Sequence, residues 1–130
     1  MNYFYTIQLQ DIQMKTEVVY FEHLDCEIIY YVGQNAKDNF SVIDIGKPDD
    51  IWFHSATESS CHVIAKIPDI ALDKKGIKTI IKKGAQLCKQ NTNKLAVLKK
   101  AEISYTTIKN IQKTSINGCV TTKNLKTIDC

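Results

Sequence analysis

Arginine is absent from this chain of 130 residues, and all 17 of its basic residues are lysines. Arginine carries a planar fork that binds guanine or phosphate in a bidentate manner, whereas the lysine ammonium group acts as a point charge. A nucleic-acid contact made by such a chain would use backbone phosphates more than base edges. An AT-rich genome would give the same bias toward lysine, and the sequence leaves both explanations open.

Several other features are missing, and each absence excludes a class of protein. No apolar run approaches the roughly 20 residues of a membrane helix. Residues 1–5 lack the basic segment of a secretory signal, so we expect a cytoplasmic protein. The five cysteines are odd in number and form no Cys-x-x-Cys pair, which fits neither a disulfide framework nor a four-ligand zinc site. Without linkers or repeats, residues 1–130 are expected to form one domain.

Candidate catalytic and metal-binding groups lack the partners that such chemistry needs. Asp49 and Asp50 are consecutive, so their carboxyl groups would face opposite ways in a strand, and closing a turn suits them better. Cys61 and His62 are neighbours in the same way, and a metal held by His54 and His62 would need a third ligand. We therefore expect no enzymatic activity, no cofactor and no bound metal.

Charge is divided unevenly along the chain. Residues 1–73 hold four lysines and twelve acidic residues, a net charge of −8, while residues 74–130 hold thirteen lysines and two acidic residues, a net charge of +11. A basic segment of this kind attracts polyanions such as nucleic acid. The alternative is a solvated lysine surface that only keeps the protein soluble.

A β-hairpin is predicted around the only tryptophan of the chain. Residues 51–55 and 61–67 are rich in β-branched and aromatic residues, and the mostly small residues 56–60 between them have turn composition. A loop of this length pairs position 52 with 64, 53 with 63 and 54 with 62.

The pairing determines which side chains share a face. Because side chains alternate along a strand, Trp52, His54 and His62 would lie on one face of the hairpin and Phe53 on the other. The two histidines could fix the hairpin through hydrogen bonds, or they could contact a nucleotide together with Trp52.

One clear helix is predicted over about residues 74–90, with Asp73 as its N-cap. Apolar and small residues recur at helical spacing on one face: Ile77, Ile80, Ile81, Gly84, Ala85 and Cys88. The other face carries a lysine stripe about 20 Å long, enough to span several phosphates: Lys75, Lys78, Lys82 and Lys89. With no acidic residue on that face, an acidic partner would relieve the repulsion between these charges.

The remaining segments predict short strands and turns. The strands cover residues 3–9, 17–21, 27–32, 96–98, 103–107, 119–122 and 125–128. Residues 41–45 could be helical, capped by Asn35 or Asp38, or they could be extended. The whole pattern predicts an α+β fold, in which one principal helix packs across an antiparallel sheet.

Several motifs occur in an order and spacing specific enough to identify a family. They are Val32-Gly33-Gln34-Asn35-Ala36-Lys37-Asp38-Asn39, Pro48-Asp49-Asp50-Ile51-Trp52-Phe53-His54, Ser60-Cys61-His62-Val63, Ala85-Gln86-Leu87, Ile103-Ser104-Tyr105-Thr106 with Lys109 and Lys113, and Gly118-Cys119-Val120. Over about residues 17–130 the chain resembles a stand-alone NFACT-R domain. This is the RNA-binding module of ribosome-quality-control and fibronectin-binding-like proteins, and it also occurs in small eukaryotic coiled-coil proteins.

The resemblance implies contact with structured ribosomal or transfer RNA and no enzymatic activity. The family's basic loop before the last hairpin is reduced here to Ser115-Ile116-Asn117-Gly118, and residues 1–16 match nothing in the family. The amino-terminal domain and long coiled coil of the full quality-control factors have no counterpart in this sequence, so tRNA recruitment and tail synthesis are not carried over.

These observations predict a non-enzymatic RNA-binding domain linked to translation or ribosome quality control. The residues expected to contact phosphates are Lys75, Lys78, Lys82, Lys109 and Lys113. The residues expected to shape or contact the RNA site are Trp52, His54, His62 and Tyr105. Two alternatives stay open: a module that docks on an acidic surface of a ribosomal or translation-associated protein, and a DNA-binding module.

Overall fold

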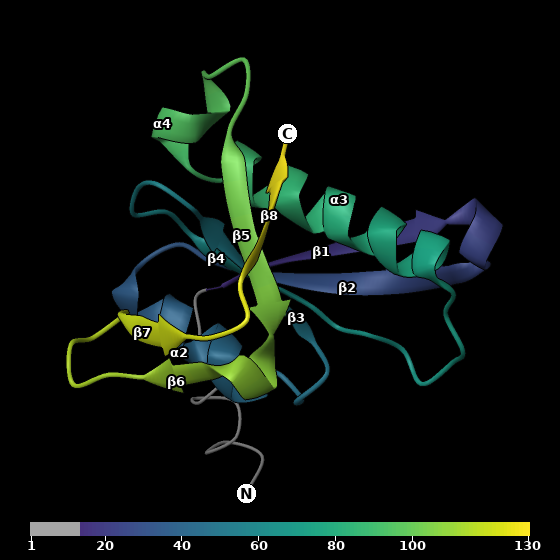
Figure 1. Cartoon of the computed structure of the whole chain (residues 1–130), viewed down its shortest axis with the longest axis horizontal. Helices are drawn as coiled ribbons and strands as arrows, with labels where there is room; N and C mark the ends of the chain where they lie inside the picture. The colour runs from purple at the N-terminus through teal and green to yellow at the C-terminus, as the bar shows by residue number, and fades with distance from the viewer. Residues whose placement is uncertain (1–13) are drawn as a thin grey trace, which may run out of the picture.

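A six-stranded antiparallel sheet forms the centre of the fold, and the computed structural model describes it within residues 14–130. In space the strands follow the order β1, β2, β4, β3, β5, β8 (Figure 1). Their bounds are β1 Lys15–Phe21, β2 Cys26–Gly33, β3 Ile51–Ser55, β4 His62–Ala65, β5 Glu102–Thr107 and β8 Lys126–Asp129. The strand predicted for residues 3–9 lies outside the described residues.

Helices and a small ribbon cover the two faces of this sheet. They are α2 Ala36–Ile45, α3 Lys74–Gln90, α4 Asn93–Ala96, the 3-10 turns η1 Glu22–Leu24 and η2 Ile108–Asn110, and the paired strands β6 Ile111–Lys113 and β7 Val120–Thr122. The helix α3 lies across one face, while α2 and the β6–β7 ribbon pack on the other (Figure 1). The predicted α+β fold, an antiparallel sheet crossed by one principal helix, is confirmed.

The hairpin around the tryptophan has the predicted register. Trp52 pairs with Ile64 and Phe53 with Val63. Phe53 and Val63 point toward α3 and belong to the main core, whereas Trp52 and Ile64 point the other way and pack with Val42 of α2. The alternation of side chains along two strands therefore divides the interior into two apolar clusters, one on each side of the sheet.

Helix α3 begins and ends where the sequence predicts. Asp73 caps it, since one of its carboxylate oxygens accepts a hydrogen bond of 2.7 Å from the backbone N–H of Gly76. The buried face includes Ile80, Ala85 and Cys88, together with Leu87, which the predicted apolar face did not include.

Three local predictions are settled by packing. The segment 41–45 is helical, and the side chain of Asn35 caps α2 by accepting a hydrogen bond from the backbone N–H of Asp38. The strand predicted for residues 96–98 is wrong, because α4 ends at Ala96 and a turn follows in which Val97 is 83% exposed. Leu95 alone of this apolar run is buried, which holds the segment as one helical turn.

The two carboxy-terminal strands, predicted over 119–122 and 125–128, exist but belong to different sheets. The strand β7 pairs with β6, whereas β8 pairs with β5 at the edge of the main sheet. Asn124 lies between them with a φ of 57°, a left-handed conformation that asparagine tolerates better than most residues. The chain therefore passes from the ribbon to the sheet at this residue.

Gly84 sets how closely α3 approaches the sheet, so its replacement by alanine should destabilise the protein. A Cβ at position 84 would lie 2.2 Å from Cζ of Phe53, which is fully buried. Overpacking costs about 1–3 kcal/mol, against a gain in helix propensity of about 1 kcal/mol. We expect Gly84→Ala to lower the free energy of unfolding by up to about 2 kcal/mol in urea titrations followed by circular dichroism.

Gly76→Ala is the matched control for this prediction. Its Cβ would meet the movable end of Leu24 at 3.0 Å and the capping oxygen of Asp73 at 3.2 Å, both looser than the contact at Gly84, so the free energy of unfolding should change less than in Gly84→Ala. Equal losses in the two variants would contradict a specific role for Gly84 in helix–sheet packing.

Candidate functional site

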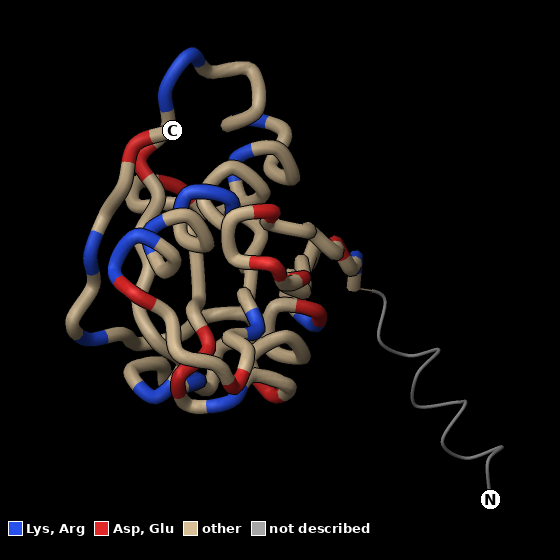
Figure 2. Tube along the Cα trace, turned by 90° about the vertical axis from the view of Figure 1, so that its right-hand side faces the viewer, with Lys and Arg blue, Asp and Glu red and all other residues tan. Residues whose placement is uncertain are grey.

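The residues predicted to contact RNA lie on two different sides of the sheet. On the α3 side are Lys75, Lys78, Lys82 and Tyr105. On the side of α2 and the β6–β7 ribbon are Trp52, His54, His62, Lys109 and Lys113. Figure 2 shows lysines on several sides of the Cα trace, with acidic positions between many of them. The predicted residues therefore do not form a single continuous surface.

The α3 lysines are the least neutralised of the predicted phosphate contacts. Lys75, Lys78 and Lys82 are exposed, and none of them forms an ion pair with a described residue. Tyr105 lies close by, at the edge of a groove of about 520 Å³ that Lys78 and Ile128 also line. This side of the molecule can attract phosphates and offers an aromatic ring beside them.

Lys109 and Lys113 have acidic partners from the amino-terminal half of the chain. Lys109 Nζ lies 3.3 Å from a carboxylate oxygen of Asp49. Lys113 pairs with Asp44, and its ammonium group lies 5.0 Å from the ring centroid of Phe40. These contacts reduce the positive charge that the two lysines present to a ligand.

Trp52 and His62 form a buried polar pair under α2. Each is only 3% exposed, and the indole N–H of Trp52 donates a hydrogen bond of 3.1 Å to Nδ1 of His62. The ring of His54 stacks on Trp52 with the ring centroids 5.6 Å apart, and it meets the ring of His62 edge to face. Stacking of a nucleotide directly on Trp52 is therefore blocked, and His54 is the more accessible ring of the three.

The hydrogen bonds of the two histidines determine where their protons lie. An indole N–H can only donate, so the proton of a neutral His62 ring is on Nε2. A peptide carbonyl can only accept, so His54 donates from Nδ1 to the carbonyl oxygen of Ser55 at 2.7 Å, and its Nε2 is left as an acceptor. Burial, together with the neighbouring His54, lowers the pKa of His62 from 6.5 to about 3. Burial also lowers the pKa of His54.

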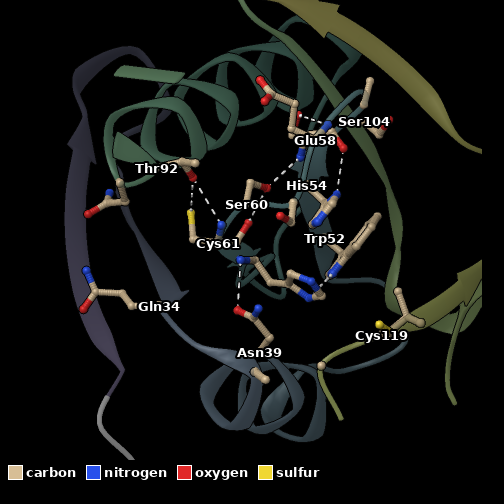
Figure 3. Close-up of a pocket in the computed structure, with 18 of the residues that line it drawn as sticks. Gln34, Asn39, Trp52, His54, Glu58, Ser60, Cys61, Thr92, Ser104 and Cys119 are labelled. Carbon is tan, nitrogen blue, oxygen red and sulfur yellow. Dashed lines mark hydrogen bonds between the residues drawn. The ribbon is translucent and has the colours of Figure 1, made fainter. Parts of the chain in front are cut away.

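A cleft of about 1140 Å³ opens beside these rings (Figure 3). It lies between the β3–β4 loop, the start of α2, the segment that follows α3, and β7. Hydroxyl and amide groups line much of it, including Asn39, Ser60, Thr92 and Ser104. The close-up shows these side chains around the Trp52 and His54 rings.

The fold holds the lining residues in place through specific contacts. The side-chain oxygen of Asn39 accepts a hydrogen bond of 3.1 Å from the backbone N–H of His62. A Cβ at Gly33 would lie 2.7 Å from that same oxygen, so glycine permits this approach of α2 to β2. Thr92 accepts a hydrogen bond from the backbone N–H of Cys61 and donates one to the carbonyl oxygen of Cys88.

No spacing pattern in the sequence marks Asn39, Ser60, Thr92 or Ser104 as site residues. Asn39, Ser60 and Ser104 lie inside motifs that carry the family resemblance, so a signal for them was present. Single hydroxyl and amide groups have no spacing that indicates a site, and only the pairing of distant strands brings these four together.

Asp50 closes the turn before β3, as the turn interpretation of Asp49-Asp50 predicts. It is 1% exposed, and its two carboxylate oxygens accept hydrogen bonds from the backbone N–H groups of Ile67 at 2.8 Å and Lys47 at 2.7 Å. The ammonium group of Lys66 lies 2.5 Å from the second oxygen. Asp49 points to solvent, so the two carboxylates do not form an acid–base pair.

Two further classes of site find no support within residues 14–130. No group of three His, Cys, Asp or Glu side chains is placed to hold a metal ion. No helix there combines the length and the apolar character needed to cross a membrane.

Comparison with known sequences gives a family match and several relatives. The family model described as the NFACT protein RNA binding domain matches residues 17–124. A coiled-coil domain-containing protein 25 homolog of Dictyostelium discoideum is 33% identical over 98 residues, which are 75% of this chain and 48% of that protein. Coiled-coil domain-containing protein 25 of Danio rerio is 32% identical over 85 residues, covering 65% and 41%. This chain thus spans less than half the length of these relatives.

Among solved structures, the C-terminal part of the fibronectin/fibrinogen-binding protein from Streptococcus suis has a similar fold. The TM-score is 0.68 with 22% sequence identity, and the match covers 88% of this chain and 44% of that one. At this level of identity the likeness shows a shared fold and nothing further.

Removing the charge of Asp50 should lower the free energy of unfolding, because the ammonium group of Lys66 would lose its buried partner. Loss of one member of a buried ion pair costs about 3–5 kcal/mol, and we expect Asp50→Asn to lie near the lower value. The control is Asp49→Asn, whose exposed pair with Lys109 should contribute less than about 1 kcal/mol. Urea unfolding measures both, and equal effects would contradict the structural role of Asp50.

Stability should fall in mild acid because His62 is buried in its neutral form. The unfolded chain binds a proton at this residue below pH 6.5, whereas the folded protein does so only near pH 3. His62 therefore does not lower the free energy of unfolding above pH 6.5. Between pH 6.5 and about pH 3 it lowers that free energy by at most about 1.4 kcal/mol per pH unit. Urea unfolding at about pH 7 and about pH 5 measures the slope.

His62→Gln removes the titrating ring but keeps an acceptor for the indole N–H, so it should show a shallower slope. Part of the slope should persist, because the pKa of His54 is lowered as well. His23→Ala, at an exposed position in η1, should leave the slope unchanged. An identical slope in the native protein and His62→Gln would refute the assignment.

Proposed function

Because the chain belongs to the family of the NFACT protein RNA binding domain, we propose that it binds RNA through the lysines of α3. The family supports an RNA-binding role in general, and the α3 surface is where this chain offers positive charge without acidic partners among the described residues. The exposed, unpaired state of Lys75, Lys78 and Lys82 is the observation that carries the assignment.

The geometry of these lysines suits a phosphate backbone. They lie on one face of a helix, and the first and last are about 10 Å apart at 1.5 Å per residue, close to two phosphate spacings of a strand. Lys126 of β8 is paired with Tyr105, so both side chains leave the sheet on the α3 side. The groove beside Tyr105 would then receive the sugar or base edge that accompanies the bound phosphates.

Lys109 and Lys113 have a secondary role in this proposal. Their acidic partners Asp49 and Asp44 are largely exposed, and exposed ion pairs contribute only about 0–1 kcal/mol. Both pairs can therefore open when a phosphate approaches. Their side of the molecule extends the contact of a long RNA and does not initiate it.

The partner we favour is structured ribosomal or transfer RNA, with a role in translation or ribosome quality control in the cytoplasm. The proposed role is binding without catalysis. Asp50 is bound within its turn while Asp49 faces solvent, and within residues 14–130 the hydrogen-bond partners of the Cys61 thiol are groups of Cys88 and Thr92. The matched part covers less than half of the coiled-coil proteins that the chain resembles, so any activity of such a whole protein would need segments beyond the matched part.

Changing Lys75, Lys78 and Lys82 together to Gln should weaken RNA binding and flatten its salt dependence. Each phosphate contact contributes about 0.7–0.9 to the slope of log K against log salt, so the triple variant should lower the slope by about 2. The measurement is fluorescence anisotropy of a labelled RNA hairpin at several salt concentrations.

The matched control changes Lys47, Lys99 and Lys100 to Gln, which removes the same charge from exposed positions elsewhere. It should alter the slope much less. Similar effects of the two triple variants would show that net charge, and not the α3 surface, governs binding. The same anisotropy measurement with a DNA duplex compares the affinities for RNA and DNA, because A-form and B-form grooves differ in shape.

A further inference from the structure

The cleft beside His54 lies at the carboxyl end of α3, where the lysine-bearing helix reaches the β3–β4 loop. Asn91, Thr92 and Lys94, which follow α3, form one wall of the cleft. In Figure 1 the β3–β4 loop lies between α4 and the α2–β7 region. A strand that follows the α3 lysines toward the end of the helix would arrive at this opening.

Nearly buried side chains point polar atoms toward the cleft without a protein partner. Nε2–H of His62, the amide nitrogen of Asn39 and the hydroxyl of Ser104 form no hydrogen bond with any side chain or backbone group of residues 14–130. The three residues are 3%, 8% and 6% exposed and all line the cleft. These three atoms keep access to the cleft although their residues are otherwise nearly buried, so a ligand or water in the cleft can bond to them.

The same wall presents an acceptor and a flat ring. Nε2 of His54 is an acceptor because Nδ1 donates to Ser55. Ser104 is paired with His54 across β3 and β5, so both side chains leave the sheet on the same face. The ring of His54 lies parallel to Trp52, with 1° between the two planes, and a further planar group could continue that stack.

The cleft has little net charge to attract a phosphate. Its charged side chains are Glu58 and Lys94, and they pair with each other at 3.7 Å. Both histidine rings are neutral near pH 7, since burial lowers the pKa of each. Donors and acceptors without charge fit the edge of a nucleobase and not its phosphate.

We propose that this cleft holds one unpaired nucleobase of the RNA, stacked on His54 and hydrogen-bonded to His62, Asn39 and Ser104. The inference rests on the proposed function, because it is the RNA backbone on α3 that would deliver the base. It predicts that the protein distinguishes RNA with accessible bases from a fully paired duplex, which the α3 lysines alone would not do.

Trp52 provides a direct measurement because it is the only tryptophan and forms the floor of the stack. The probes are a single-stranded RNA of mixed sequence, about 12 nucleotides long, and a GC-rich blunt duplex of similar length. We expect the single strand to change the emission of Trp52 and the duplex to bind without changing it. Equal changes with both RNAs, or binding of the single strand without any change, would overturn the proposal.

Two variants test the contacts themselves. His54→Ala and Ser104→Ala should each lower affinity for the single strand, the first by about tenfold, and leave duplex affinity unchanged in anisotropy measurements. The matched control His23→Ala, at an exposed histidine, should bind both RNAs as the native protein does. Urea unfolding confirms that each variant is folded. Unchanged single-strand affinity in both folded cleft variants would refute the site.

The outcomes separate this inference from the proposed function. Both RNAs could bind through the α3 lysines while the emission of Trp52 stays constant and His54→Ala keeps the native affinity. In that case the cleft proposal fails and the RNA-binding proposal stands. If neither RNA binds at low salt, both fail. A change in Trp52 emission with a neutral peptide and none with RNA would assign the cleft to a protein partner and overturn the nucleobase proposal.

Discussion

The alternation of side chains along β3 is the constraint on which the rest of the structure depends. Phe53 points to α3, where the absence of a side chain at Gly84 lets the helix approach the sheet. Trp52 and His54 point the other way, toward α2 and the cleft. A shift of one residue in this strand would exchange the two faces and place the indole against α3. Pairing with β4 on one side and β5 on the other prevents that shift.

The second face of the sheet carries a cluster of uncharged polar rings beside its apolar residues. An indole and two imidazole rings pack together there, and the indole N–H is satisfied by Nδ1 of His62. That single bond sets the tautomer of His62, and the bond from His54 to Ser55 sets the opposite tautomer of the second ring. The wall of the cleft thus has a defined pattern of donors and acceptors, which a pair of freely rotating histidines would lack.

Charge separation along the sequence does not become charge separation on the surface. Lys109 and Lys113 come from the basic half, yet they meet Asp49 and Asp44 of the acidic half across the fold. Short-range pairing of opposite charges follows wherever packing brings the two halves together. Lys75, Lys78 and Lys82 form no ion pair with a described residue, because their face of α3 is exposed to solvent.

Local patterns in the sequence were sufficient for helix α3 and the hairpin register. The spacing of Ile80 and Ala85 places α3, Asp73 marks its start, and the loop after Ser55 sets which residues of β3 and β4 face each other. Local patterns failed at residues 96–98, where a short apolar run favours a strand but Leu95 alone finds a core. A run this short has no period of its own, so its tertiary neighbours decide.

The sequence alone therefore determined the α+β arrangement and the two faces of the hairpin, since these follow from patterns within short stretches of the chain. It identified the family through motifs spread over about residues 17–130. Only the tertiary structure decided that the α3 lysines and the Trp52 cluster lie on opposite sides of the sheet, and that Asn39 and Ser104 meet in one cleft. The physical reason is that these relations depend on which distant segments pair and pack. Contacts between distant segments produce no periodic pattern in the local sequence.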